Sequence, residues 1–123
     1  MKAAPRVLVV EDEKDLCHLI ERYLQHLGYA VETASSGEEA CNVIGSAGGV
    51  FDVYLIDITL PGMQGDELAD RMIRDNPSVK IILSSGYSNE WRARETDRTS
   101  IRYLPKPYQP KQLADMLQAL AAQ

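Results

Sequence analysis

Short apolar runs alternate along the chain with longer segments of helical periodicity. The apolar runs are candidate strands, and they cover residues 6–10, 29–34, 52–56, 80–84 and 101–104. The first, third and fourth runs are almost entirely apolar, which is typical of strands in a parallel sheet that is covered on both faces. Strands that alternate with helices indicate repeated βα units. The pattern therefore predicts an α/β fold on a parallel sheet of five strands.

The first two helical segments carry clear signals at their ends. The first is expected to end at Gly28, because glycine commonly occupies the position after a helix. Its apolar stripe consists of Leu16, Leu19, Ile20, Tyr23, Leu24 and Leu27. The second begins with a capping-box sequence at 36–39 and is expected to end at the glycine pair 48–49.

Three further helices are expected in the second half of the chain. One covers residues 65–75 and ends before Pro77, which cannot continue a helix. The last has Pro110 in its first turn, where proline is tolerated, and an apolar side made of Leu113, Met116, Leu117 and Leu120. Between them, residues 88–97 have the weakest apolar periodicity, with charges on most sides, and we predict a fifth helix there.

Length and charge narrow the class of protein. The 123 residues are enough for one domain over 1–123 with a core at about 6–120, and too few for two. An output module would therefore lie elsewhere. The net charge of −5 argues against a direct nucleic-acid surface, because contacts to phosphates need clustered Lys and Arg. We expect the partner to be a protein.

Neither a membrane segment nor a thiol site is expected. No apolar stretch approaches the roughly 20 residues that cross a bilayer, and residues 1–5 lack the apolar core of a signal peptide. Cys17 and Cys41 are far apart in the sequence and lack the spacing of a zinc or redox pair. A cytoplasmic location is therefore expected.

Polar side chains follow four of the five candidate strands. Glu11 and Asp12 follow the first, Asp57 the third, Ser85 the fourth and Lys106 the fifth. Taken singly, a carboxylate at a strand end is a turn former or part of an acidic first helical turn. Together they are expected to converge, because the carboxyl ends of parallel strands meet at one edge of a sheet. Carboxylates so close repel one another unless a cation holds them, and Mg²⁺ prefers oxygen ligands.

In order and spacing, these residues resemble the receiver domain of two-component response regulators, and the resemblance extends from about Arg6 to Leu120. It implies a doubly wound, flavodoxin-like fold with strand order 2-1-3-4-5 and five helices in three α/β/α layers. It also implies Mg²⁺-dependent transfer of a phosphoryl group from a phosphohistidine to Asp57. That transfer would switch a protein-interaction surface in phosphorelay signal transduction. Such a domain is an autocatalytic phosphoacceptor and not a stand-alone enzyme.

The resemblance implies a role for each residue at the strand ends. Asp57 would be the phosphoacceptor, and Asp12 and Asp57 would bind Mg²⁺ directly. Glu11 would act through water or at longer reach, and the backbone carbonyl of Thr59 would supply a further ligand. Glutamate in place of aspartate at position 11 is a mild departure from the family pattern. Lys106 would offset the charge on the transferring phosphoryl oxygens.

Four further expectations concern the geometry of the site and its response to phosphorylation. Ser85 is expected to pair its hydroxyl with the phosphoryl group, in preference to Ser84, because a small residue directly follows it. Tyr103 stands where receivers carry a switch aromatic that rotates inward as that hydroxyl moves. The Lys106–Pro107 bond is expected to be cis, and the bulk of Tyr87 is expected to slow hydrolysis of the acyl phosphate.

The implied donor is a histidine kinase or a histidine phosphotransfer protein, and an output domain or another protein would read the switch. A phosphorylation-dependent dimer is a further option. The runs 83–88 and 103–108 look most like receivers of hybrid histidine kinases. Two other functions stay open. A degenerate receiver would only bind partners, and an aspartyl-phosphate hydrolase of the haloacid dehalogenase type is opposed by the threonine at position 59.

Overall fold

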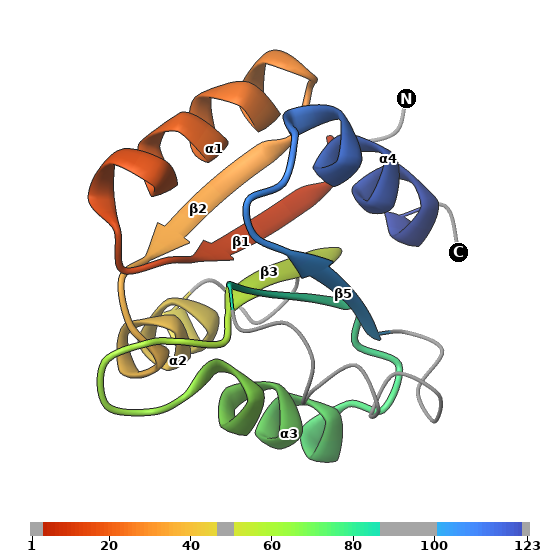
Figure 1. The fold of residues 1–123 in the computed structure, drawn as a ribbon. Helices are drawn as coiled ribbons and strands as arrows, with labels where there is room; N and C mark the ends of the chain where they lie inside the picture. The colour runs from red at the N-terminus through yellow and green to blue at the C-terminus, as the bar shows by residue number, and fades with distance from the viewer. Residues whose placement is uncertain (1–3, 47–50, 87–100, 122–123) are drawn as a thin grey trace.

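The structure is a computed structural model that describes residues 4–46, 51–86 and 101–121. Its strands form one parallel sheet in the order β2-β1-β3-β4-β5 (Figure 1). They are β1 (Arg6–Val10), β2 (Ala30–Ala34), β3 (Val53–Asp57), β4 (Ile81–Ser85) and β5 (Ile101–Pro105). Every strand begins and ends within one residue of the run expected from the sequence. The predicted parallel sheet and its strand order are therefore confirmed.

Helices cover both faces of the sheet. The described residues contain α1 (Lys14–His26), α2 (Gly37–Ser46), α3 (Gly65–Asp75) and α4 (Pro110–Ala121). α1 and α4 lie on one face, and α2 and α3 lie on the other, which gives three α/β/α layers (Figure 1). The fifth helix expected at 88–97 and the glycine pair expected to end α2 lie outside the described residues.

The core is divided between the two faces, because alternate residues of a strand point to opposite sides of a sheet. Under α2 and α3, the strands contribute Leu8, Val10, Tyr54, Ile56, Ile81, Leu83 and Ile101. Under α1 and α4, they contribute Val7, Val9, Val53, Leu55, Ile82 and Leu104. A fully buried side chain of this kind stabilises the fold by about 2 kcal/mol. The strand ends are thus held by packed side chains from both sides.

Local signals set the end of α1 and the start of α2 as expected, with one shift. Gly28 has a φ of 101° and directly follows the C-cap Leu27. At the start of α2, the backbone N–H of Glu39 donates to Ser36 Oγ at 3.0 Å. The Glu39 carboxylate accepts hydrogen bonds from the backbone N–H and the hydroxyl of Ser35, at 3.2 and 3.1 Å. In a capping box the Glu39 side chain would accept from the backbone N–H of Ser36, so this contact is displaced by one residue to Ser35.

The buried stripe of α1 is narrower than the sequence predicted. Ile20 and Leu24 are buried, but Leu19 is 68% exposed and Leu27 is 45% exposed. An α-helix turns about 100° per residue, so Leu19 lies at the edge of the stripe that Ile20 centres. Leu27 follows the last helical turn as the C-cap. The prediction that all six apolar residues share the buried side is wrong for these two.

Candidate functional site

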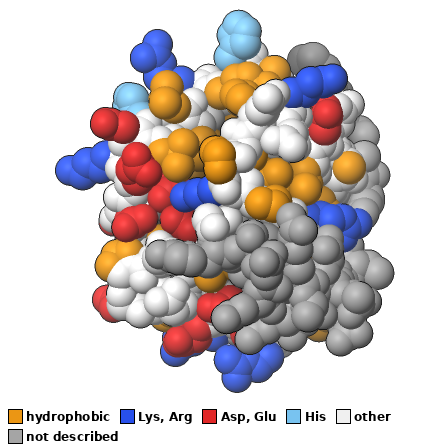
Figure 2. Space-filling model, viewed as in Figure 1, with side chains coloured by type: hydrophobic (Ala, Val, Ile, Leu, Met, Phe, Trp, Pro, Cys, Tyr) orange, Lys and Arg blue, Asp and Glu red, His pale blue; other side chains and the backbone are white. Residues whose placement is uncertain are grey.

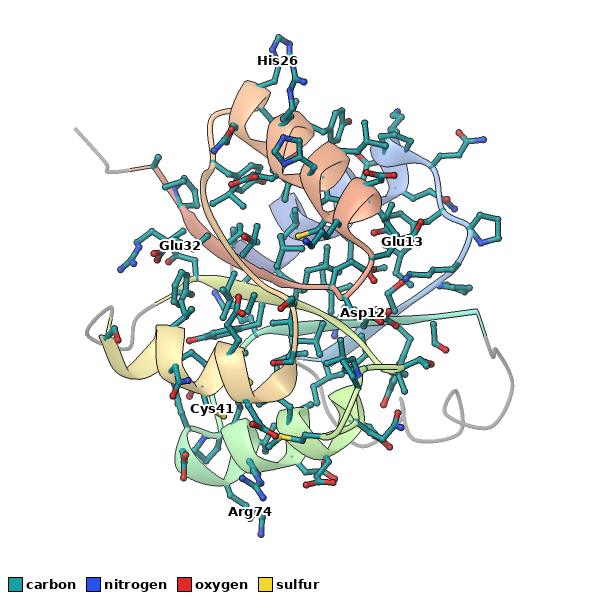
Figure 3. All side chains as sticks on the ribbon, turned by 90° about the vertical axis from the view of Figure 1, so that its left-hand side faces the viewer. Asp12, Glu13, His26, Glu32, Cys41 and Arg74 are labelled. Carbon is teal, nitrogen blue, oxygen red and sulfur yellow. The ribbon has the colours of Figure 1, made fainter. Side chains whose placement is uncertain are left out.

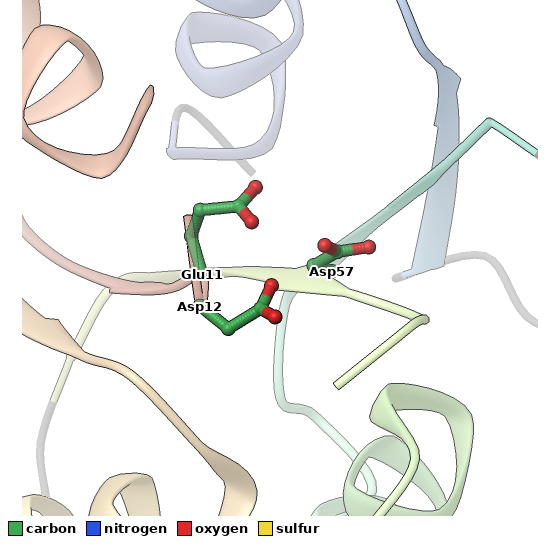
Figure 4. A group of neighbouring side chains, drawn as sticks. All are labelled: Glu11, Asp12 and Asp57. Carbon is green, nitrogen blue, oxygen red and sulfur yellow. The ribbon is translucent and has the colours of Figure 1, made fainter. Parts of the chain in front are cut away.

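Three carboxylates meet at the carboxyl edge of the sheet. β1 and β3 are neighbours with Val10 opposite Ile56, so the next residues, Glu11 and Asp57, stand side by side. One carboxylate oxygen from each of Glu11, Asp12 and Asp57 lies within 4.8 Å of the others (Figure 4). Glu11 and Asp57 are only 5% and 7% exposed, whereas Asp12 is exposed. The structure thus brings together the three acids that the sequence placed at this edge.

Lys106 joins two of these carboxylates. Its Nζ lies 2.8 Å from Glu11 Oε1 and 3.2 Å from Asp57 Oδ2. The backbone N–H of Lys106 donates to the carbonyl of Ser85 at 3.0 Å, which extends the pairing of β4 with β5 by one residue. The bond from Lys106 to Pro107 is cis, as expected from the sequence. The lysine therefore enters the acidic site from the end of β5, a strand two positions away from β3, which carries Asp57.

The electrostatics of the site follow from burial. The pKa of Glu11 is raised to about 7, first because the side chain is buried and also because Asp57 is close; a hydrogen bond from Lys106 limits the rise. Burial lowers the pKa of the Lys106 ammonium, but Glu11 and Asp57 outweigh it and the pKa is raised. Among the residues that the structure describes, one ammonium meets three carboxylates, which leaves negative charge in excess. This donor set fits a divalent cation that prefers oxygen ligands.

The Asp57 carboxylate is oriented from two directions. Asp57 Oδ1 accepts a hydrogen bond from the backbone N–H of Thr59 at 3.1 Å, and Oδ2 faces Lys106. The backbone N–H of the intervening Ile58 donates to the carbonyl of Ser84 at 2.8 Å, so the chain stays attached to β4 beyond the end of β3. Both oxygens of Asp57 therefore have fixed neighbours.

The two serines at the end of β4 face opposite sides of the sheet. Ser84 lies opposite Leu104 and follows Ile82 by two residues, so it faces α1 and α4. Its Oγ is buried without a hydrogen-bond partner in the described structure. Ser85 is buried on the other side, the side on which Tyr103 packs half-buried against the core under α2 and α3. Ser85 and Tyr103 thus share a face of the sheet, and Ser84 lies on the other.

Tyr108 is a neighbour of the site that the sequence interpretation missed. The pKa of its phenol is raised far above the ordinary value, first by burial and then by the negative charges of Glu11 and Asp57. Tyr108 also lines an apolar groove between α1 and the start of α4, together with Leu16, Leu19, Ile20, Tyr23, Pro110 and Leu113. Hydrophobic side chains gather over these two helices in Figure 2. Its position two residues after Lys106 was the only sequence signal.

Other chemically reactive side chains lie elsewhere. His18 is 73% exposed and 3.7 Å from Glu21 on α1, and His26 lies at the far end of that helix from Asp12 (Figure 3). Cys17 is half-buried and Cys41 is exposed on α2, and both are free thiols. Tyr87, expected to shield the acyl phosphate, lies outside the described residues. Among the residues that the structure describes, no helix is both long enough and apolar enough to span a membrane.

Comparisons with known proteins agree with this geometry. The chain is 36% identical over 115 residues to the sensor kinase CckA of Brucella abortus, covering 93% of this chain and 12% of that protein. The receiver domain protein of Methanospirillum hungatei superposes with a TM-score of 0.86 at 27% identity, covering 97% of this chain and 94% of that one. The response regulator TrrA of Thermotoga maritima, solved with Mg²⁺ and BeF, has a TM-score of 0.82 at 32% identity, covering 94% and 98%.

The family comparison covers almost the whole chain. The chain spans about half or less of the length of the curated relatives it matches, so the relatives contain further segments. The model of the response regulator receiver domain matches residues 7–118, which include every strand but the first residue of β1 and all four described helices but the last residues of α4. The chain belongs to the response regulator receiver domain family.

Proposed function

We propose that this receiver domain accepts a phosphoryl group on Asp57. The observation that carries the proposal is the contact of Lys106 Nζ with both Glu11 and Asp57, at 2.8 and 3.2 Å, beside Asp12. In the transfer, a carboxylate oxygen of Asp57 bonds to phosphorus, and the bond from phosphorus to the donor's histidine nitrogen breaks. The electron pair of that bond stays on the nitrogen. The products are an acyl phosphate on Asp57 and an unmodified histidine.

The same residues are suited to hold Mg²⁺. Asp12 and Asp57 would bind it directly, Glu11 through water or at longer reach, and the carbonyl of Thr59 as a further ligand. When bound, the ion would offset negative charge on the transferring phosphoryl oxygens. Lys106 would offset charge on the other side of the same group. The N–H of Thr59 already orients the acceptor carboxylate through Oδ1.

Phosphorylation would be read on the face of the sheet that carries Ser85 and Tyr103. An acyl phosphate adds negative charge and strong acceptor oxygens, so the Ser85 hydroxyl would gain a charge-assisted hydrogen bond by moving toward them. Tyr103 is half-buried at the rim of the core on that face and would rotate into the space that Ser85 leaves. Tyr103 would be in equilibrium between its outward and inward positions. Phosphorylation would shift this equilibrium only by as much as it stabilises the inward state relative to the outward state.

The groove between α1 and α4 is suited to bind the phosphohistidine protein. It is lined by Tyr108, which is also close to Glu11 and Asp57, so a partner seated there would lie beside the acceptor. Leu19 projects into water next to the groove at 68% exposure. Leu19→Asp should therefore slow transfer from a phosphohistidine protein and leave labelling by acetyl phosphate unchanged. Equal loss with both donors, or no loss with either, would contradict this role of the groove.

Around this site we infer one receiver domain over residues 1–123. An output domain or a separate protein would read the switch, and neither nucleic acid nor a membrane would be contacted directly. The similarity to CckA supports an origin in a hybrid histidine kinase. A cytoplasmic location and a phosphorylation-dependent dimer belong to the same proposal.

The test is labelling by acetyl phosphate in Mg²⁺, followed by intact-protein mass spectrometry. Wild type should gain one phosphoryl group, and Asp57→Asn should gain none, because the nearly isosteric amide is a poor nucleophile. Circular dichroism would establish that both proteins are folded. An unlabelled wild type that still responds to a partner would indicate a binding module, and sustained release of phosphate from small phosphoesters would indicate a hydrolase.

A further inference from the structure

The first residue of α3 lies against the backbone of the acceptor residue. Gly65 is buried, and its backbone N–H donates to the carbonyl of Ile58 at 2.8 Å. A Cβ built on Gly65 would lie 2.1 Å from the carbonyl oxygen of Asp57 and 2.8 Å from both the carbonyl carbon of Asp57 and Cα of Ile58. Real Cβ atoms do not approach other heavy atoms so closely. Only glycine lets α3 begin at this place.

The atoms that such a Cβ would meet cannot easily move aside. They belong to the backbone at 57–58, and this segment is attached on its other side to β4 by the hydrogen bond from the Ile58 N–H to the Ser84 carbonyl, 2.8 Å. The next residue, Thr59, donates its N–H to the Asp57 carboxylate at 3.1 Å. A displacement at Gly65 would therefore be transmitted to the acceptor carboxylate and to the Thr59 backbone.

We propose that Gly65 is a positioning residue for phosphoryl acceptance: its missing side chain seats α3 on residues 57–59 and so fixes the acceptor carboxylate and the Thr59 carbonyl. The inference rests on the proposed function of Asp57. Gly65 would act through the backbone of residues 57–59, which carries the Asp57 carboxylate and the Thr59 carbonyl. Reacting groups lose about a hundredfold in rate for a misplacement of about 1 Å, so a small shift of this segment has a measurable consequence.

Two other glycines serve as matched controls. A Cβ on Gly45, in α2, would have nothing within 4 Å. For a Cβ on Gly37, at the start of α2, the nearest atoms would belong to the flexible side chain of Met63, the closest at 3.1 Å. The positive-φ glycines are those at 28 and 62, so among the described glycines these three do not require a left-handed backbone. None of the three substitutions, Gly65→Ala, Gly37→Ala and Gly45→Ala, forces alanine into a left-handed backbone conformation. They therefore differ in the atoms that the new methyl group would contact.

The experiment compares Gly65→Ala with Gly37→Ala and Gly45→Ala. The Mg²⁺ dissociation constant is measured from the NMR shift of the Thr59 amide, and the labelling rate with acetyl phosphate is measured well below the melting temperature of each variant. Gly65→Ala should weaken Mg²⁺ binding and slow labelling by about tenfold or more, and the amides of residues 57–59 should shift. Gly37→Ala and Gly45→Ala should stay within about twofold of wild type.

A merely structural role would lower the melting temperature and leave the Mg²⁺ affinity of the folded protein unchanged. Folded Gly65→Ala that binds Mg²⁺ and is labelled like wild type overturns the inference. If Gly65→Ala does not fold, amide hydrogen exchange is measured on the wild-type protein instead. Mg²⁺ should slow the exchange of the Gly65 amide. If Mg²⁺ shifts the NMR signal of the Thr59 amide but leaves the exchange rate of the Gly65 amide unchanged, the inference is overturned. Failure of wild type to be labelled, or labelling that survives Asp57→Asn, counts instead against the proposed function.

Discussion

The amino and carboxyl ends of the sheet both carry an ion pair, but water reaches only one of them freely. At the amino end, Arg6 and Glu32 are 3.1 Å apart, with side chains 39% and 49% exposed. At the carboxyl end, Lys106 and Glu11 are 2.8 Å apart, with side chains 21% and 5% exposed. Exposed pairs contribute about 0–1 kcal/mol, whereas buried charges are costly unless they are paired. The buried pair is therefore better explained by chemistry than by stability.

At the amino end, Arg6 also makes contacts that do not involve Glu32. The backbone N–H of Arg6 donates to Asp52 Oδ2 at 2.7 Å, and its guanidinium lies 4.6 Å from the centroid of the Phe51 ring. Losing the Glu32 carboxylate would leave these contacts in place. At the carboxyl end, in contrast, the loss of Lys106 would leave Glu11 and Asp57 facing each other. The difference between the two ends can be measured by removing one partner at a time.

Lys106→Ala should have the largest effect on stability. Without Mg²⁺ it should lower the free energy of unfolding by about 2 kcal/mol, because two buried carboxylates lose their counterion, although Glu11 can take up a proton instead. Urea unfolding with and without Mg²⁺ measures this, and added Mg²⁺ should recover part of the loss. Labelling of Asp57 should be slow but still detectable in this variant. Unchanged stability in the metal-free protein would show that the two ends of the sheet do not differ.

Stability should depend on pH through Glu11. Its pKa in the folded protein is raised from 4.5 to about 7, so the folded state binds this proton more tightly than the unfolded state does. The resulting stability is fully present below about pH 4.5 and is lost as the pH rises through about 7. Urea unfolding of metal-free protein across this range should show the decline. Glu11→Gln should remove it, and a slope that persists in Glu11→Gln would assign it to another group.

Glu32→Gln should have the smallest effect. The exposed pair with Arg6 contributes little in water, so the free energy of unfolding should change by less than about 0.5 kcal/mol, and added salt should reduce even that difference. The labelling rate of Asp57 should equal that of wild type. A loss as large as that of Lys106→Ala, or slower labelling, would mean that the amino end contributes more than its exposure implies.

The elements of the fold and the place of the site were predictable from the sequence, because both depend on local patterns and on one rule of topology. The apolar runs that end before Glu11 and at Asp57 read as strands, and parallel strands present their carboxyl ends at one edge. Gly28 and Ser36 act on the residues next to them, so the signals at those helix ends were visible without the rest of the chain.

Contacts that depend on tertiary packing were not predictable. The burial of Tyr108 beside Glu11, for example, depends on the path of the chain between β5 and α4. The unpartnered hydroxyl of Ser84 and the seat of Gly65 on Asp57 arise between elements that are distant in the sequence. A serine at a strand end and a glycine at a helix start are both common. The residue types at 84 and 65 therefore do not reveal these contacts in the sequence.

The most direct test of the account locates the phosphoryl group on the chain. Protein labelled by acetyl phosphate in Mg²⁺ is reduced with borohydride, which converts an aspartyl phosphate to homoserine, and is then digested and sequenced by mass spectrometry. We expect homoserine at Asp57 in wild type and at no position in Asp57→Asn. Homoserine at Asp12, or a phosphoryl group on any residue other than Asp57, would contradict the assignment of Asp57 as the acceptor.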